Sequence, residues 1–265
     1  MPAAAPLHDI RPVDVRAAEV ITVGTDGSYW GGMALDWATR HAWTRGASLH
    51  VLRAHLDVPS DVPTDLGLSH AHRLYPLLPI TCRWAGPTPV VELTTASEHS
   101  SLLVLGCRGH RHFGLGELVV PALAGARSDT TVVRGAPAAV RGEHRVVTAM
   151  VSGGPDDDVV LHRAADFALS HHCRLRVVHA APTDLRLGRS PEDVLHIAEL
   201  QLKALGLAVR ASFTLARQLP HEVVQNPGDT DLLVLARGES PRHPLGLVTR
   251  AALYHSPCPV MVVHS

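Results

Sequence analysis

The chain has few aromatic residues and no excess of charge of either sign. Phe, Trp and Tyr make up 4% of its 265 residues, whereas hydrophobic residues together reach 46%. Such a core is built from Ala, Val and Leu, as is typical of helices packed on a sheet. The formal net charge is −1 at pH 7, so there is no basic surplus to neutralise nucleic-acid phosphates. The composition favours a globular protein and argues against a nucleic-acid binder.

Cysteines and long apolar runs are also scarce. The four cysteines form no C-x-x-C pair; they are Cys82, Cys107, Cys173 and Cys258. This usage predicts reduced thiols in a cytoplasmic protein. No apolar stretch approaches the ~18 residues that a membrane span needs. Residues 1–17 lack the basic and apolar regions of a secretory signal and predict a disordered lead-in. We therefore expect no membrane partner.

The sequence repeats itself. The stretches that begin at Val20 and at Val146 each contain an apolar run, a glycine-rich turn, an amphipathic helix pattern and a second apolar run. Further along, Gly116–Val133 aligns without a gap with Gly246–Val263. Two diverged copies of one unit therefore account for nearly the whole chain, and we predict two domains, residues 18–140 and 141–265.

Apolar runs of strand length alternate with helical patterns in both copies. The strand candidates are Val20–Gly24, Ser48–Ala54, Leu78–Trp84, Ser101–Gly106, Thr130–Arg134, Arg145–Val151, Arg174–Ala180, Leu207–Leu215, Asp231–Ala236 and Pro259–His264. Continuous apolar runs such as "LLVL" are typical of parallel strands covered on both faces. The alternation predicts two tandem α/β domains, each a doubly wound, five-stranded parallel sheet. Only Asp57–Leu77, with its prolines, predicts a loop with at most a short helix.

Three segments together resemble the universal stress protein family in its tandem two-domain form. They are "TDGS" after the first strand, "LVLGCRG" at the fourth strand and "HSPCPVMVV" near the end. The resemblance covers about residues 18–265. It implies a flavodoxin-like fold of the adenine-nucleotide alpha-hydrolase group, a regulatory role in stress response, and pairing of domains through their last strands.

Many members of this family bind ATP, and the resemblance implies which residues would meet it. Thr25 and Asp26 match the place where the family's Asp meets the nucleoside, and Ala54 matches the position whose backbone meets the adenine. The phosphates would lie on a glycine motif written G-x2-G-x9-G-[S/T]. Glycines there let backbone N–H groups approach phosphate oxygens. The matching residues are Gly106, Arg108 and Gly109, with Gly116 as the third glycine.

The second half of this motif departs from the family pattern. Only six residues separate Gly109 from Gly116, and Glu117 follows where the family has a hydroxyl. A carboxylate beside a triphosphate costs on the order of 1 kcal/mol or more. In the second copy Ser152, Leu235 and Leu247 replace family residues, and seven residues separate Gly238 from Gly246. These departures predict that triphosphate binding is weakened or lost; the alternative is an ATP or AMP sensor in the first domain.

The nineteen histidines raise the question of a metal site. His110 and His112 flank the glycine loop beside Cys107, but a histidine-rich composition predicts exposed loop residues instead, so we predict no metal. Together with Arg108 and Arg111, these histidines give the loop a positive charge that attracts a monophosphate, a cyclic nucleotide or another small anion. The acidic run Pro155–Asp158 favours a helix N-terminus over a magnesium site.

No nucleophile, base and orienting group are recognisable as a set, and G-x-S-x-G is absent. We therefore expect a protein that is not an enzyme. The runs "TTVVRG" at residues 130–135 and "PVMVVHS" at 259–265 predict exposed sheet edges, which need covering. They predict a homo-oligomer that forms through these edge strands.

Overall fold

The computed structural model describes residues 19–54, 65–109, 114–182, 190–238 and 242–264. The strands of the first half are β1 Val20–Thr25, β2 Ser48–Arg53, β3 Ile80–Trp84, β4 Leu102–Gly106 and β5 Asp129–Val133. Those of the second half are β6 Val146–Val151, β7 Arg174–Ala180, β8 Ala211–Ala216, β9 Leu232–Ala236 and β10 Val260–Val263. Each of them overlaps a strand expected from the sequence.

Helices connect the strands within each half. They are α1 Tyr29–Arg45, α2 Asp65–Leu74, α3 Pro89–Ser97, α4 Val119–Gly125, α5 Pro137–Arg141, α6 Asp157–Ser170, α7 Pro191–Ala204, α8 Pro220–Gln225 and α9 Leu247–His255. The side chain of Ser190 begins α7 by accepting a hydrogen bond from the N–H of Asp193, as an N-cap serine does. The expectation of at most a short helix within Asp57–Leu77 is wrong, since α2 has ten residues.

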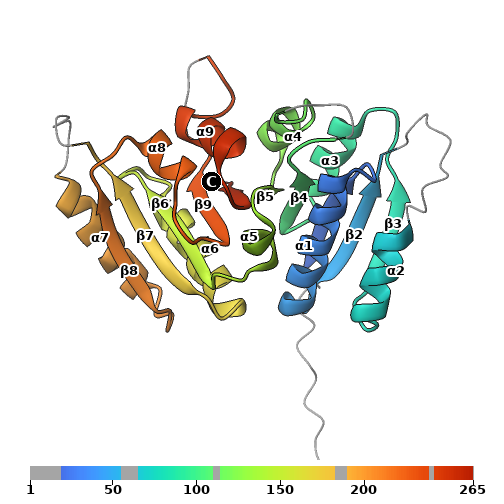
Figure 1. Cartoon of the computed structure of the whole chain (residues 1–265), viewed down its shortest axis with the longest axis horizontal. Helices are drawn as coiled ribbons and strands as arrows, with labels where there is room; N and C mark the ends of the chain where they lie inside the picture. Colours follow the sequence, from blue (N-terminus) through green and yellow to red (C-terminus); the bar gives the residue numbers. More distant parts are fainter. Residues whose placement is uncertain (1–18, 55–64, 110–113, 183–189, 239–241, 265) are drawn as a thin grey trace, which may run out of the picture.

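The described strands form one sheet in the order β3-β2-β1-β4-β5-β10-β9-β6-β7-β8 (Figure 1). Each half has the same internal order and is parallel throughout, which confirms the doubly wound α/β fold. Residues 1–17 lie outside the described residues. The domain boundary at residue 140 falls inside α5 and stays a prediction.

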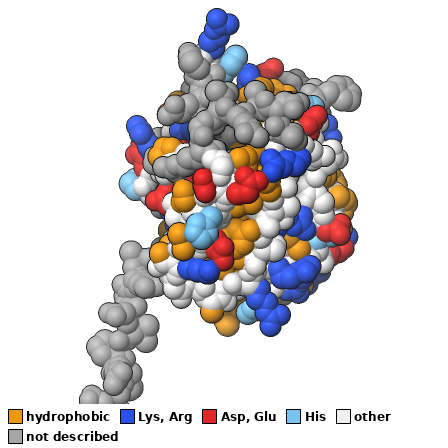
Figure 2. Space-filling view, turned by 90° about the vertical axis from the view of Figure 1, so that its left-hand side faces the viewer, with side chains coloured by type: hydrophobic (Ala, Val, Ile, Leu, Met, Phe, Trp, Pro, Cys, Tyr) orange, Lys and Arg blue, Asp and Glu red, His pale blue; other side chains and the backbone are white. Residues whose placement is uncertain are grey.

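The two halves join through their last strands. β5 and β10 pair antiparallel, with Val132 opposite Val260 and Thr130 opposite Val262. The prediction that these strands are exposed edges is therefore wrong: their backbone groups pair within the chain, which removes the basis for a homo-oligomer through them. The ends of the described sheet are β3 and β8. Figure 2 looks onto the β8 end, where hydrophobic side chains form a band between charged ones and Leu200 of α7 is 51% exposed.

Two layers of apolar side chains cover the faces of the sheet. One layer runs through both halves and contains buried residues of α1, α6 and α7, among them Trp37 and Phe167. The other face is covered by α3, α4, α8 and α9, and there Val132 and Val260 share a core across the junction. No described helix is both long and apolar enough to cross a membrane.

Candidate functional site

The strand order places the predicted site residues at one end of the first half. β1 lies between β2 and β4, and its neighbours are reached by crossovers in opposite directions. In open parallel sheets, ligands bind in the crevice at the carboxyl ends of strands where the order reverses. Thr25 ends β1, Ala54 follows β2 and Gly106 ends β4. The fold therefore brings together the predicted residues from three separate parts of the chain.

The turn after β1 uses its polar groups within the chain. The N–H of Ser28 donates to Asp26 Oδ1 at 3.0 Å, and the N–H of Gly27 donates to Thr25 Oγ1 at 3.2 Å. Ser28 is the N-cap of α1: its Oγ accepts from the N–H of Gly31 at 3.1 Å and donates to the carbonyl of Arg108 at 3.4 Å. The Ser28 side chain thereby links the turn after β1 to the loop after β4.

The loop after β4 packs directly on this turn. A Cβ at Gly109 would lie 2.5 Å from Asp26 Oδ2, and one at Gly106 would lie 2.6 Å from the carbonyl oxygen of Trp30. Both contacts are closer than any Cβ tolerates without a shift of its neighbour. The two glycines thus allow close approach of two backbone segments, with the Asp26 carboxylate against Gly109.

Gly116 closes the same loop. Its N–H donates to the carbonyl of Cys107 at 2.8 Å, and a Cβ on it would lie 3.2 Å from the Cα of Arg108. The amide that the family motif would turn toward a phosphate is therefore bonded inside the protein. Glu117, the next residue, is exposed.

Ala54 and Arg108 lie on either side of this turn. The N–H of Ala54 donates to the carbonyl of Thr25 at 2.9 Å, so this amide is engaged by the end of β1. The guanidinium of Arg108 lies over the ring of Trp30, 5.8 Å from its centroid. Such an arrangement holds a cation beside the crevice.

The described residues near the loop give no support to a metal or a reactive thiol. Burial raises the pKa of the Cys107 thiol, an effect that outweighs the nearby cations Arg134 and Arg108. This direction fits the predicted inert thiol. Among the described residues no three His, Cys, Asp or Glu side chains lie close enough to hold a metal. His110, Arg111 and His112 lie outside the described residues.

The second half contains a carboxylate that the sequence reading did not place in the site. Val147 of β6 pairs with Leu232 of β9, just as Ile21 of β1 pairs with Leu102 of β4. The two halves therefore align with Val147 at the position of Ile21. In this alignment Asp157 corresponds to Gly31. Asp157 is 5% exposed and accepts the N–H groups of Ser152 and Gly153, at 2.9 and 2.7 Å. Burial raises its pKa, against the opposing effect of these bonds.

This carboxylate occupies the backbone donors at the end of β6. Such donors at a strand-to-helix turn are the groups that hold an anion in a working crevice. The acidic run "PDDD" was the available signal, and its interpretation as a helix N-terminus is consistent with α6, which begins at Asp157. The pattern could not indicate which of its carboxylates turns inward.

The strand register corrects one residue of the second copy. Because Leu102 corresponds to Leu232, Gly106 corresponds to Ala236, and the assignment of its place to Leu235 is wrong. The error of one residue arose because the segment "LARG" at the end of β9 is one residue shorter than the segment "LGCRG" at the end of β4. Gly246 closes this loop as Gly116 does, since its N–H donates to the carbonyl of Arg237 at 3.1 Å.

Comparison with solved structures shows which fold the chain has. A universal stress protein from Archaeoglobus fulgidus DSM 4304 matches with a TM-score of 0.68 at 17% identity, over 93% of this chain and 98% of that chain. The chain has the universal stress protein fold. A second structure with this fold, a putative universal stress protein from Pseudomonas aeruginosa UCBPP-PA14, matches with a TM-score of 0.66 at 14% identity, over 93% of each chain.

The universal stress protein fold also occurs in a protein with a different task. The cytoplasmic domain of a prokaryotic cation chloride cotransporter matches with a TM-score of 0.63 at 13% identity, over 92% of this chain and 94% of that chain. No family model matches the chain, and no curated protein matches it. At these identities the likeness establishes the fold, and function must be argued from the site.

Proposed function

We propose that this chain is a non-enzymatic regulatory protein of the universal stress type whose two fused halves have lost triphosphate binding in the family's usual pose. One observation carries the proposal: in each half, backbone amides at the predicted anion site already have partners inside the protein. Gly116 donates to Cys107 in the first half, and Ser152 and Gly153 donate to Asp157 in the second. A phosphate would have to displace these bonds.

Electrostatic repulsion also opposes triphosphate binding. A triphosphate seated over the first half would meet the carboxylate of Glu117, and one over the second half would meet that of Asp157. Two like charges 4 Å apart repel by about 1 kcal/mol in water and by about 4 kcal/mol near a protein surface. Arg108 offsets part of this repulsion in the first half only.

A second function is favoured by Arg108 and by the intact residues after β1 and β2. In this alternative the first half is a sensor of a less charged adenine nucleotide such as AMP. Asp26 would meet the ribose, Ala54 the adenine, and Gly106, Gly109 and Arg108 a single phosphate. Cytoplasmic action fits both functions, since all four cysteines are free thiols.

Isothermal titration of the full chain with ATP and with AMP separates these functions. We expect no saturable heat with ATP, and its absence with AMP as well supports the first function. Saturable binding of AMP that Gly109→Val abolishes supports the sensor. The matched control is Gly32→Ala on α1, where an added Cβ meets nothing within 4 Å. Micromolar ATP binding that is lost in Gly109→Val would overturn the proposal.

Turnover of radiolabelled ATP tests the absence of catalysis. We expect the same background rate for the wild type and for Gly109→Val. A wild-type rate above that of the variant would show that the chain is an ATPase.

A further inference from the structure

An open groove is lined by residues of α8, of α9 and of the loop before α9. Figure 1 shows these two helices beside each other in the second half. The groove has a volume of about 620 Å³, and Val120 of α4, in the first half, completes its wall. Pockets of roughly 300–1,000 Å³ are the size that holds a small ligand. The lining is mainly apolar, and Leu247 and Tyr254 in it are 62% and 49% exposed. Exposed side chains of this size, gathered in a concave surface, mark a binding site more often than chance exposure does.

The structure gives one cation in this groove no ion-pair partner among the residues that it describes. Arg250 of α9 lines the groove, and its Nε is inaccessible to water and makes no hydrogen bond within the described part of the chain. Its guanidinium likewise forms no ion pair with any described residue. Arg237 differs, because its terminal nitrogens donate to the carbonyls that end α4. Leaving a buried donor unpaired is costly, so a missing acceptor is expected at Arg250.

The other polar side chains of the groove suit an anion. Histidines line it from three places: His221 of α8, His243 of the loop before α9, and His255 at the end of α9. No Asp or Glu is among the described residues that line it. The groove therefore offers a guanidinium and imidazole donors beside apolar walls, with no carboxylate to compete for them.

The helices of the first half that correspond to α8 and α9 do not carry the same side chains. By the gapless alignment of α4 with α9, the groove residues are replaced in the first half by Glu117 for Leu247, Val120 for Arg250, Ala124 for Tyr254 and Gly125 for His255. A Cβ at Gly125 would lie 2.6 Å from Thr94 Cγ2, so α3 packs closely on α4 there. The side chains that give the groove its cation and its apolar wall are thus not shared by the two copies of the repeat.

We propose that this groove binds a small organic anion with an apolar body. Its carboxylate or phosphate pairs with Arg250, and its apolar part lies over Leu247 and Tyr254 against Val120. None of the residues named for the nucleotide crevice of the first half lines this groove, so the proposal stands whether or not the first half binds a nucleotide.

Isothermal titration of the full chain with decanoate tests this site. We expect saturable binding at one site, weakened by about tenfold or more in Arg250→Gln, because charge-assisted hydrogen bonds are lost. The matched control is Arg242→Gln, which removes the same charge from an exposed residue just before α9 and should leave binding unchanged. Equal affinities in these two variants, or no saturable binding to the wild type, would overturn the proposal.

Two further measurements test whether decanoate binding depends on the anion and not on the apolar chain alone or on a loss of folding. Val120→Glu leaves Arg250 in place but adds a carboxylate to the groove, and should abolish decanoate binding while the urea midpoint shows a folded chain. Decyltrimethylammonium has the same apolar chain and the opposite charge, and should not bind. Binding of this cation as tight as that of decanoate would show a purely apolar surface and refute the anion site.

Discussion

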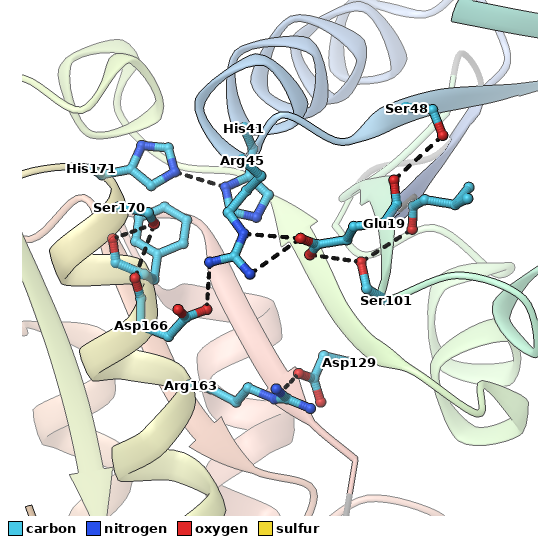
Figure 3. A network of polar contacts seen from close by, with 12 residues as sticks. Glu19, His41, Arg45, Ser48, Ser101, Asp129, Arg163, Asp166, Ser170 and His171 are labelled. Carbon is cyan, nitrogen blue, oxygen red and sulfur yellow. Dashed lines mark hydrogen bonds and ion pairs between the residues drawn. The ribbon is translucent and has the colours of Figure 1, made fainter. Parts of the chain in front are cut away.

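The imidazoles of His41 and His171 meet across the junction of the two halves, with His41 Nδ1 and His171 Nε2 2.7 Å apart (Figure 3). His41 lies on α1 and His171 directly follows α6. Phe167 stacks on both rings, with centroids 5.1 Å from His41 and 4.0 Å from His171. Of the two nitrogens in this bond one must donate and the other accept, so the pair cannot bind while both rings are fully protonated.

Acid should destabilise the chain through this pair. Burial lowers the pKa of both histidines, and together with Arg40 and Arg45 it lowers the pKa of His171 to about 4. The unfolded state, with histidine pKa values near 6.5, therefore binds protons first. The free energy of unfolding should fall as the pH drops from about 6.5 toward 4, measurable by urea titration at a series of pH values.

The variant His171→Gln isolates this effect from the titration of buried carboxylates, which is common to both proteins. Glutamine keeps a donor and an acceptor for His41 but does not titrate. The difference in unfolding free energy between the wild type and the variant should shrink as the pH falls. A constant difference across that range would contradict the assignment.

Arg45 should matter more to stability than an exposed ion pair does. Its guanidinium lies 2.7 Å from Asp166 of α6 and 3.2 Å from Glu19, and so joins the two halves (Figure 3). Arg45→Met should lower the free energy of unfolding by about 1–3 kcal/mol, because it leaves half-buried carboxylates without their cation. Arg141→Met, which breaks the exposed pair of Arg141 with Glu143, should lower the free energy of unfolding less, because exposed ion pairs contribute little. Equal losses in urea unfolding would contradict this ranking.

Gly135 should tolerate no side chain. Its φ is +93°, and a Cβ on it would lie 2.1 Å from the carbonyl oxygen of Pro257, in the other half. Gly135→Ala should therefore cost about 3 kcal/mol or more, or prevent folding. The control is Gly142→Ala, which has φ +75° but open space around its Cβ, and should cost only about 1 kcal/mol. Thermal or urea midpoints compare the two; similar shifts would mean that the Pro257 contact is unimportant.

Cys82 should be the fast-reacting thiol of the folded chain. It is exposed on β3, whereas Cys107 and Cys258 are buried. Burial raises the pKa of Cys173 to about 11 and that of Cys258 to about 12, which keeps them protonated near neutral pH. A disulfide reagent at pH 8 should modify one thiol in native protein and all four in urea. Rapid reaction in Cys82→Ser would refute this.

Periodicity and the internal repeat were enough to predict the strands, because a parallel strand covered on both faces needs a continuous apolar run. The length of α2 was underestimated because the prolines of Asp57–Leu77 argue against a helix. These prolines all lie outside α2. The pairing of β5 with β10 was implied by the family resemblance, yet the same strands were assigned as edges. An apolar strand pattern indicates that an edge must be covered, but does not indicate by which segment.

The sequence was enough to predict where the candidate site lies in the fold. It was not enough to predict the hydrogen bonds that the residues of this site make. The residues after β1 and β4 meet because strand order places them together; that they bind a ligand stays a prediction. That Gly116 donates to Cys107, or that Asp157 binds the amides of Ser152 and Gly153, depends on loop paths. Such paths are set by tertiary packing, so residue types alone could not give them.

Joining the halves in one polypeptide, through β5 and β10, frees them from symmetry. In a homodimer with a twofold axis every substitution appears twice, and each surface faces a copy of itself. The position of Val120 corresponds to that of Arg250, so a dimer of second halves would place two like-charged guanidinium groups at the groove. Gene fusion lets one half provide the cation and the other the apolar wall.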